Sequence, residues 1–188
     1  MDFLNSIILL TNFIIVPGIT YGSQLALGAI GVTLIYGVLR FANFAYGDLM
    51  AFGTMIVILV TWFLQSKGIT FGLLPTALLA LPVGILLTIA VSLFFDKTVF
   101  EYYRNKKSDP VTFIVVSLGI MFVLNALVRI IIGPNDINFM DGHKFIMKAR
   151  EFKQMTGLNE GLALKSTQVI TLITTIITCS ILFYFLNK

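Results

Sequence analysis

Long apolar runs separated by short polar breaks dominate this chain. Five of the runs approach the length of about 20 residues that a membrane-spanning helix needs. They cover Ile19–Leu39, Leu49–Leu64, Leu73–Phe95, Val111–Ile132 and Thr167–Leu186. The pattern predicts an all-α fold, a polytopic transmembrane helix bundle with about five spans.

A shorter apolar run, Phe3–Val16, precedes the first span and ends at Pro17-Gly18. A proline at this position predicts a break between two helices, which makes the run a half-span or an interfacial helix. The run lacks a positive n-region and a small-residue cleavage site, so we interpret it as a retained helix rather than a signal peptide.

Basic residues suggest how the spans are oriented. The segment Asp96–Pro110 is rich in Lys and Arg, which places it in the cytoplasm by the positive-inside rule. Alternation then puts Arg40–Asp48 on the same side and Lys67 outside. It also puts Ile137–Lys165 outside, although this segment carries several basic residues of its own. Charge alone therefore leaves the orientation open.

Composition agrees with a membrane protein. Of the 188 residues, 57% are hydrophobic and 12% are charged, against about 25% charged in a soluble domain. The mean hydropathy is +0.95. We expect residues 1–188 to form one transmembrane domain. The net charge is +4, and the basic residues lie in the loops beside the apolar runs, which argues against nucleic-acid binding.

Catalytic, metal and cofactor sites are not expected. Cys179 is the single cysteine, so neither an internal disulfide nor a cysteine-based metal site can form. The chain contains no HExxH or GxSxG motif, and it contains no phosphate-binding GxxxxGK[ST] loop.

Small and polar residues form stripes within the spans. Gly18 and Gly22 make a GxxxG motif, and Gly28 and Gly31 share a helical face with Gln24. Small residues let helices approach closely in lipid, so a packing face is one interpretation. A face that lines a solute path is the other, and Gln24 favours it.

A second stripe lies in the fourth span. Asn125 and Arg129 are one turn apart on the face that carries Ser117. Arg129 lies near the helix end, where it either snorkels to the headgroups or lines a polar cavity.

The junction after the first span concentrates polar groups. Arg40 and Asp48 are spaced so that they could neutralise each other where solvation is poor. Asn43 or Asp48 could cap the following helix, and Gly47 would permit a chain reversal. An ordered interfacial turn and a functional site are equally compatible with this pattern.

This junction resembles the N-terminal block of branched-chain amino-acid ABC transporter permeases, which typically reads LGLTLIYGVLRxxNFAHGD. The matching residues are Gly31, Thr33, Tyr36-Gly37, Asn43-Phe44-Ala45 and Gly47-Asp48. Tyr46 stands where the family usually has His. A second match comprises Ser117-Leu118-Gly119-Ile120, Asn125 and Ile132-Gly133-Pro134, whereas Phe100–Arg104 departs from the family's Arg-Pro-Leu-Arg-like segment.

The resemblance implies an ABC-importer permease in the cell inner membrane that carries branched-chain amino acids. Its implied partners are a second permease subunit, two cytoplasmic ATPase subunits and an extracytoplasmic solute-binding protein. The family's ATPase-engaging segment would begin just after residue 188, so the resemblance implies a domain that is incomplete at its C-terminus, as a fragment or a truncated paralogue. In such a permease Asn43, Tyr46 and Asp48 would hold the junction near the translocation path, and Gln24, Asn125 and Arg129 would line its interior.

Other functions stay open from the sequence. Urea or short amides are alternative solutes. A passive channel would conduct without ATP, and a truncated membrane protein would interact with partners without transport. A membrane enzyme is the least supported class.

Overall fold

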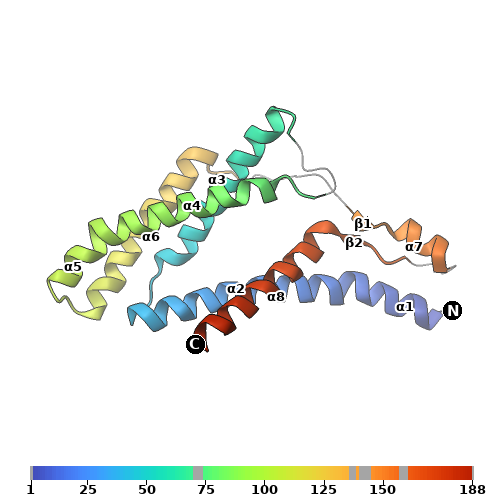
Figure 1. Ribbon diagram of the computed structural model, residues 1–188, viewed down its shortest axis with the longest axis horizontal. Coiled ribbons are helices and arrows are strands. Elements are labelled where there is room, and N and C mark those ends of the chain that lie inside the picture. Colours follow the sequence, from blue (N-terminus) through green and yellow to red (C-terminus); the bar gives the residue numbers. More distant parts are fainter. Residues whose placement is uncertain (1, 70–73, 136–138, 140–144, 157–160, 188) are drawn as a thin grey trace. The chain divides into compact units, whose positions relative to one another are not determined.

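The computed structural model describes residues 2–69, 74–135, 139, 145–156 and 161–187, and its regular structure is almost entirely helical (Figure 1). Among these residues, five helical segments are long and apolar enough to cross a membrane: Asn5–Leu39, Ala45–Ser66, Ala77–Asn105, Pro110–Ile132 and Ser166–Leu186. The chain is therefore a multi-pass membrane protein, and the predicted all-α polytopic fold is confirmed.

The first membrane segment is one continuous helical stretch. It comprises α1 (Asp2–Leu10), the π-helix η1 (Thr11–Ile15) and α2 (Val16–Leu39). The predicted break at Pro17-Gly18 is wrong. The N–H of Val16 donates to the carbonyl of Thr11, a wider turn than in an α-helix. A proline ring clashes with the carbonyl four residues earlier, and this π-turn directly before Pro17 accommodates it.

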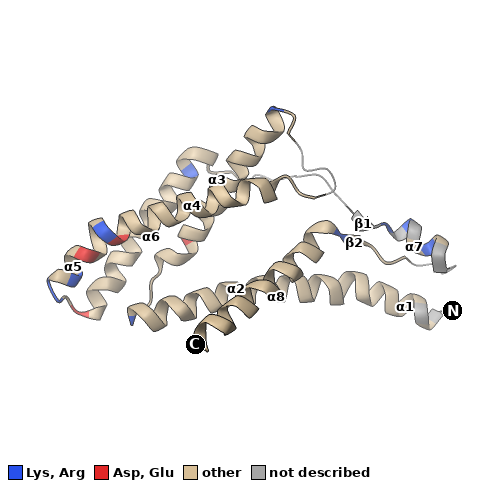
Figure 2. Cartoon of the chain, viewed as in Figure 1, with Lys and Arg blue, Asp and Glu red and all other residues tan. Residues whose placement is uncertain are grey.

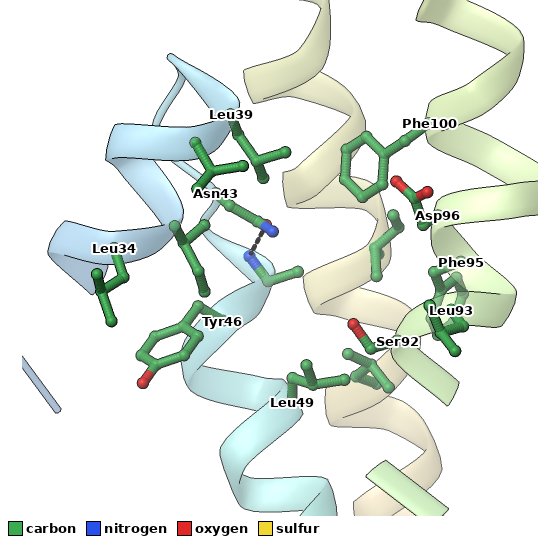
Figure 3. Close-up of a pocket in the computed structure, with 15 residues that line it drawn as sticks. Leu34, Leu39, Asn43, Tyr46, Leu49, Ser92, Leu93, Phe95, Asp96 and Phe100 are labelled. Carbon is green, nitrogen blue, oxygen red and sulfur yellow. Dashed lines mark hydrogen bonds between the residues drawn. The ribbon is translucent and has the colours of Figure 1, made fainter. Parts of the chain in front are cut away.

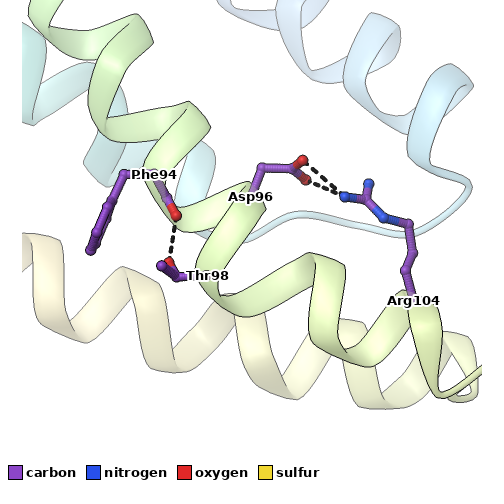
Figure 4. A network of polar contacts seen from close by, with 4 residues as sticks. All are labelled: Phe94, Asp96, Thr98 and Arg104. Carbon is purple, nitrogen blue, oxygen red and sulfur yellow. Dashed lines mark hydrogen bonds and ion pairs between the residues drawn. The ribbon is translucent and has the colours of Figure 1, made fainter.

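The third membrane segment also continues where a loop was predicted. It comprises α4 (Ala77–Phe95), the π-helix η2 (Asp96–Phe100) and α5 (Glu101–Asn105). Most of the charged segment Asp96–Pro110 is thus helical, and only a short turn precedes α6 (Pro110–Ile132). One Arg104 nitrogen donates to both carboxylate oxygens of Asp96 at 3.0 and 2.9 Å, and the Thr98 hydroxyl donates to the carbonyl of Phe94 (Figure 4). These bonds stabilise polar residues on a helix.

The chain forms two compact units. Unit 2 comprises Gly31–Gly72 and Thr76–Asp141 and contains α3 (Ala45–Ser66), α4, η2, α5 and α6. Its buried core consists of Phe41, Ala45, Phe100, Ile120 and Leu124. Within unit 2, Lys, Arg, Asp and Glu gather around η2 and α5, while α3, α4 and α6 are almost free of charge (Figure 2).

Within unit 2, small residues bring α3 and α4 together. A Cβ atom added to Gly84 would lie 2.4 Å from a γ-carbon of Val57, and one added to Gly53 would lie 2.6 Å from the Thr88 hydroxyl. Sequence inspection missed this pair of glycines because neither belongs to a GxxxG motif. Their spacing becomes meaningful only when the two helices face each other.

Unit 1 comprises residues 1–30, 73–75 and 142–188. The segment Ile137–Lys165, predicted as a polar loop, contains β1 (Phe145–Met147) and α7 (Ala149–Thr156), and it ends in β2 (Leu164–Lys165), which leads into α8 (Ser166–Leu186). The two strands pair antiparallel. Asn12 of η1 donates to the Gly161 carbonyl at 2.6 Å and accepts from the Ala163 N–H at 3.0 Å. The expectation of a single transmembrane domain stays a prediction.

We predict that Gly84→Ala lowers the free energy of unfolding by about 1–3 kcal/mol, because the added methyl group overpacks the contact with Val57. The measurement is the thermal midpoint of the detergent-purified chain. Gly119→Ala in α6 is the matched control, since its added Cβ meets no atom within 4 Å and alanine favours a helix over glycine. Equal midpoints for the two variants would contradict the prediction.

Candidate functional site

The chain reverses direction at Arg40, directly after α2. Arg40 has φ of 60°, in the left-handed region that few residues other than glycine adopt. Gly47, which was predicted to make the reversal, instead lies in the first turn of α3. After the reversal Phe41 is buried, with its ring centroid 5.8 Å from that of Phe100 and 5.1 Å from that of Phe113. The predicted turn is thus real but is made by a different residue.

Two side chains hold the start of α3. The side-chain oxygen of Asn43 accepts the N–H of Ala45 at 3.1 Å. The predicted helix cap by Asn43 or Asp48 is wrong, because Phe44 occupies the N-cap position of α3 and no side chain caps it. The N–H of Phe44 donates to the hydroxyl of Ser117 at 3.2 Å, and that hydroxyl donates to the Ile114 carbonyl at 2.8 Å. Ser117 is fully buried. The sequence placed Ser117 on a polar stripe, but it gave no signal that the Ser117 hydroxyl accepts a hydrogen bond from the backbone N–H of Phe44, just before another helix.

A chain of polar groups links α3 to α6. The Asn125 amide donates to a carboxylate oxygen of Asp48 at 2.9 Å, and the Nε of Arg129 donates to the Asn125 side-chain oxygen at 2.9 Å. The predicted Arg40–Asp48 pair is wrong, because within the described residues Asp48 bonds Asn125 while Arg40 forms no ion pair. Asp48 is therefore connected to a different arginine, with one carboxamide between them.

This polar chain, Asp48–Asn125–Arg129, joins the first turn of α3 to the second half of α6, with Arg129 in the last turn of that helix. The contacts of Phe44 with Ser117 and of Asp48 with Asn125 show that α3 and α6 run in the same direction. At about 1.5 Å per residue, Asn125 lies about 22 Å along α6 from Pro110. Asn125 and Arg129 are exposed on the chain. Ionisable groups within membrane segments face a polar interior in membrane proteins.

A cavity of about 410 Å³ lies beside the junction. It is lined mainly by apolar side chains, with Asn43, Tyr46, Ser92 and Asp96 as its polar members. Figure 3 shows Asn43 and Tyr46 on one side of this cavity and Ser92 and Asp96 on the other. The combination of an apolar wall with a few polar groups is typical of a small-molecule site.

Tyr46 packs against α2 at Gly31. A Cβ atom added to Gly31 would lie 1.9 Å from the Tyr46 hydroxyl oxygen. The predicted packing role of Gly31 therefore has a specific neighbour.

The remaining predicted residues lie on α2 without such a neighbour. Gln24 is exposed, and Cβ atoms added to Gly18, Gly22 and Gly28 would meet nothing within 4 Å in the described structure. Their roles in a solute path or in helix packing stay predictions.

No cluster of three or more His, Cys, Asp or Glu side chains that could hold a metal ion is present among the described residues. The lone thiol, Cys179, is partly exposed on α8. The chemistry that this site offers is thus hydrogen bonding and charge, from one carboxylate, one amide and one guanidinium.

Residues 14–188 match a family model described as "Branched-chain amino acid transport system / permease component". The chain is 30% identical over 121 residues to the high-affinity branched-chain amino acid transport system permease protein LivH of Escherichia coli K12, a match that covers 64% of this chain and 38% of LivH. It is 38% identical over 55 residues to BraD of Pseudomonas aeruginosa, which carries the same description, covering 29% of this chain and 18% of BraD.

The match with LivH of Salmonella typhimurium is similar, at 28% identity over 121 residues. The matched segment thus spans about two fifths of the length of the LivH relatives. No solved structure matches the chain significantly.

We predict that Gly31→Ala destabilises the α2–α3 packing and that Tyr46→Phe partly restores it, because the nearest clashing atom is the tyrosine hydroxyl oxygen. In a double-mutant cycle of thermal midpoints, the two substitutions should therefore be non-additive. Gly37→Ala, on the same helix and with open space around its added Cβ, is the control. Strictly additive effects would show that the two residues are not coupled.

Proposed function

Because the chain belongs to the family of permease components of branched-chain amino acid transport systems, we propose that it is a membrane-spanning subunit of an ATP-driven importer in the cell inner membrane. Its partners are a second permease subunit, two cytoplasmic ATPase subunits and an extracytoplasmic solute-binding protein. We place ATP hydrolysis on the ATPase partners and propose no catalytic role for this chain, whose sequence contains no GxxxxGK[ST] phosphate loop.

The solutes we propose are leucine, isoleucine and valine. The names of LivH and BraD describe branched-chain amino acid transport, and we extend this assignment to the present chain through family membership. Such a solute carries one ammonium, one carboxylate and one branched apolar side chain. The polar chain offers a carboxylate and a guanidinium linked by one amide. The cavity of about 410 Å³ beside the junction, which none of these three side chains lines, offers a mainly apolar wall.

The observation that carries this proposal is the hydrogen-bonded chain Asp48–Asn125–Arg129 on two neighbouring membrane helices. Opposite charges at its two ends favour a zwitterion over an ion of either sign. Because Asn125 links both ends, its amide holds the carboxylate and the guanidinium in place when no solute is bound. The two membrane helices would then open and close a path around this polar chain, driven by the ATPase partners.

The direct test is uptake of radiolabelled leucine, isoleucine and valine by cells of the source organism, with and without the gene for this chain. We expect deletion to abolish uptake, and restoration of the gene to recover it only when the partner ATPase is catalytically intact. Labelled urea and acetamide test the alternative solutes in the same cells.

Each other outcome corresponds to a different function. Uptake that is restored without a working ATPase indicates a passive channel. Amino-acid uptake that is unchanged by deletion of the gene, in cells whose membranes normally contain the chain, indicates a membrane protein that interacts with partners without transporting a solute. Selective loss of urea or acetamide uptake reassigns the solute while leaving the permease proposal intact.

We predict that Asp48→Asn lowers leucine uptake at least about tenfold, equivalent to about 1.4 kcal/mol of transport barrier. The amide keeps the size of the carboxylate but removes its charge. Glu101→Gln in α5 is the matched control, since it removes an exposed acid outside this polar chain. Membrane abundance of both variants is measured by immunoblot. Uptake by Asp48→Asn at the wild-type rate would remove the carboxylate from the mechanism.

A further inference from the structure

A second cavity lies at the end of unit 2 where α2 meets α5 and α6. Its volume is about 340 Å³. The wall is apolar and aromatic, with Phe41, Phe100 and Phe113 among its members, and the charged side chains at it are Arg40, Asp96 and Arg104. A cavity that combines an apolar wall with two guanidinium groups fits a ligand that has an apolar body and an anionic headgroup.

Both arginines have N–H groups that donate no hydrogen bond to another described side chain. Arg104 uses one of its nitrogens for both contacts with Asp96, and the side chain is about half exposed (Figure 4). Arg40 is exposed and forms no ion pair within the described part of the chain. An arginine has five N–H donors in a planar fork that matches phosphate oxygens. Neutralising Asp96 therefore leaves the site with a net positive charge.

Two basic residues at this end of unit 2 adopt a backbone conformation that arginine and lysine rarely adopt. Within the described residues, two residues other than glycine have positive φ, Arg40 at 60° and Lys107 at 53°. Both are basic, and both make chain reversals at this end of unit 2. Glycine or asparagine adopts this conformation with less strain. Arginine and lysine at these two positions therefore suggest a function for the cations beyond making the turn.

Further cations lie in the segment 96–109, which contributes Asp96, Phe100 and Arg104 to the cavity. Lys97 lies on η2, and Lys106 and Lys107 lie between α5 and α6. A side-chain hydrogen bond with Tyr102 raises the pKa of Lys106 above its usual value, so this ammonium stays charged throughout the physiological pH range. The acids of the same end are Asp96, Glu101 and Asp109.

From these observations we infer that this cavity is a binding site for an anionic phospholipid. The Arg40 guanidinium and the unused donors of Arg104 bind the headgroup phosphate, and the acyl chain lies against the aromatic wall. Basic pockets between membrane helices are a recurrent way to recognise anionic headgroups. A phospholipid is favoured over a free phosphate ion because most of the wall is apolar and would gain nothing from an inorganic ion.

The test measures the thermal midpoint of the detergent-purified full chain during titration with phosphatidylglycerol, with phosphatidylcholine and with inorganic phosphate. We expect stabilisation by phosphatidylglycerol that neither of the other two reproduces. Arg40→Asn should bind phosphatidylglycerol about fivefold more weakly. Its midpoint without lipid should equal or exceed that of wild type, since asparagine tolerates the left-handed conformation.

Two further variants distinguish the effect of the Arg40 charge from an effect on folding. Arg40→Lys keeps a cation and should retain part of the phosphatidylglycerol effect. Lys67→Asn removes a cation at the opposite end of α3 and should leave the effect unchanged. A photoactivatable phosphatidylglycerol should crosslink to residues 38–41 or 100–113 in the wild-type chain. This readout does not depend on the stability of any variant.

The proposal is overturned if Arg40→Asn and wild type respond equally to phosphatidylglycerol, or if phosphatidylcholine stabilises as well as phosphatidylglycerol. Equal stabilisation by inorganic phosphate would assign the site to a free anion and overturn the lipid assignment. Crosslinks confined to other segments would do the same. None of these readouts requires transport, so they are independent of the proposed importer function.

Discussion

The burial of Phe41 between Phe100 and Phe113 is the contact on which the geometry of unit 2 depends. It anchors the chain immediately after the reversal at Arg40 and fixes where α3 begins. From that point Phe44 reaches the buried hydroxyl of Ser117. One turn later Asp48 meets Asn125 on α6. The aromatic cluster thus sets the register of two membrane helices, and the polar site follows from that register.

The sequence predicted the existence of the spans and of the polar junction, but it predicted the wrong partner for Asp48. Arg40 is close to Asp48 in sequence, whereas Asn125 is 77 residues away. Proximity along the chain is a poor guide here, because the reversal at Arg40 and the burial of Phe41 separate the two charges. The stripe of Asn125 and Arg129 was visible as a helical face, yet nothing local showed which helix that face would meet.

The predicted helix boundaries at Pro17 and after Phe95 are wrong, because the residues there that usually end a helix lie within continuous helical stretches. Pro17 and the charged residues after Phe95 are breaking signals in a soluble protein, yet both lie within continuous helical stretches. A backbone interrupted inside the bilayer would leave N–H and C=O groups without partners, which is costly. In both places a π-turn, η1 or η2, preserves backbone hydrogen bonding across the irregular sequence.

The continuity of α1, η1 and α2 has a geometric consequence for the N-terminal part of the chain. The apolar stretch Asn5–Leu39 has 35 residues, which corresponds to about 52 Å of helix. A hydrocarbon layer about 30 Å thick accommodates only about 39 Å of helix even at a steep tilt of about 40°. At least two turns of this helical stretch must therefore project beyond the lipid tails. Asn12 bonds the backbone at Gly161 and Ala163, so the N-terminal part of this stretch is tied to the segment that leads into α8. The same helix that is long enough to cross the bilayer therefore also holds a segment about 150 residues later in the chain.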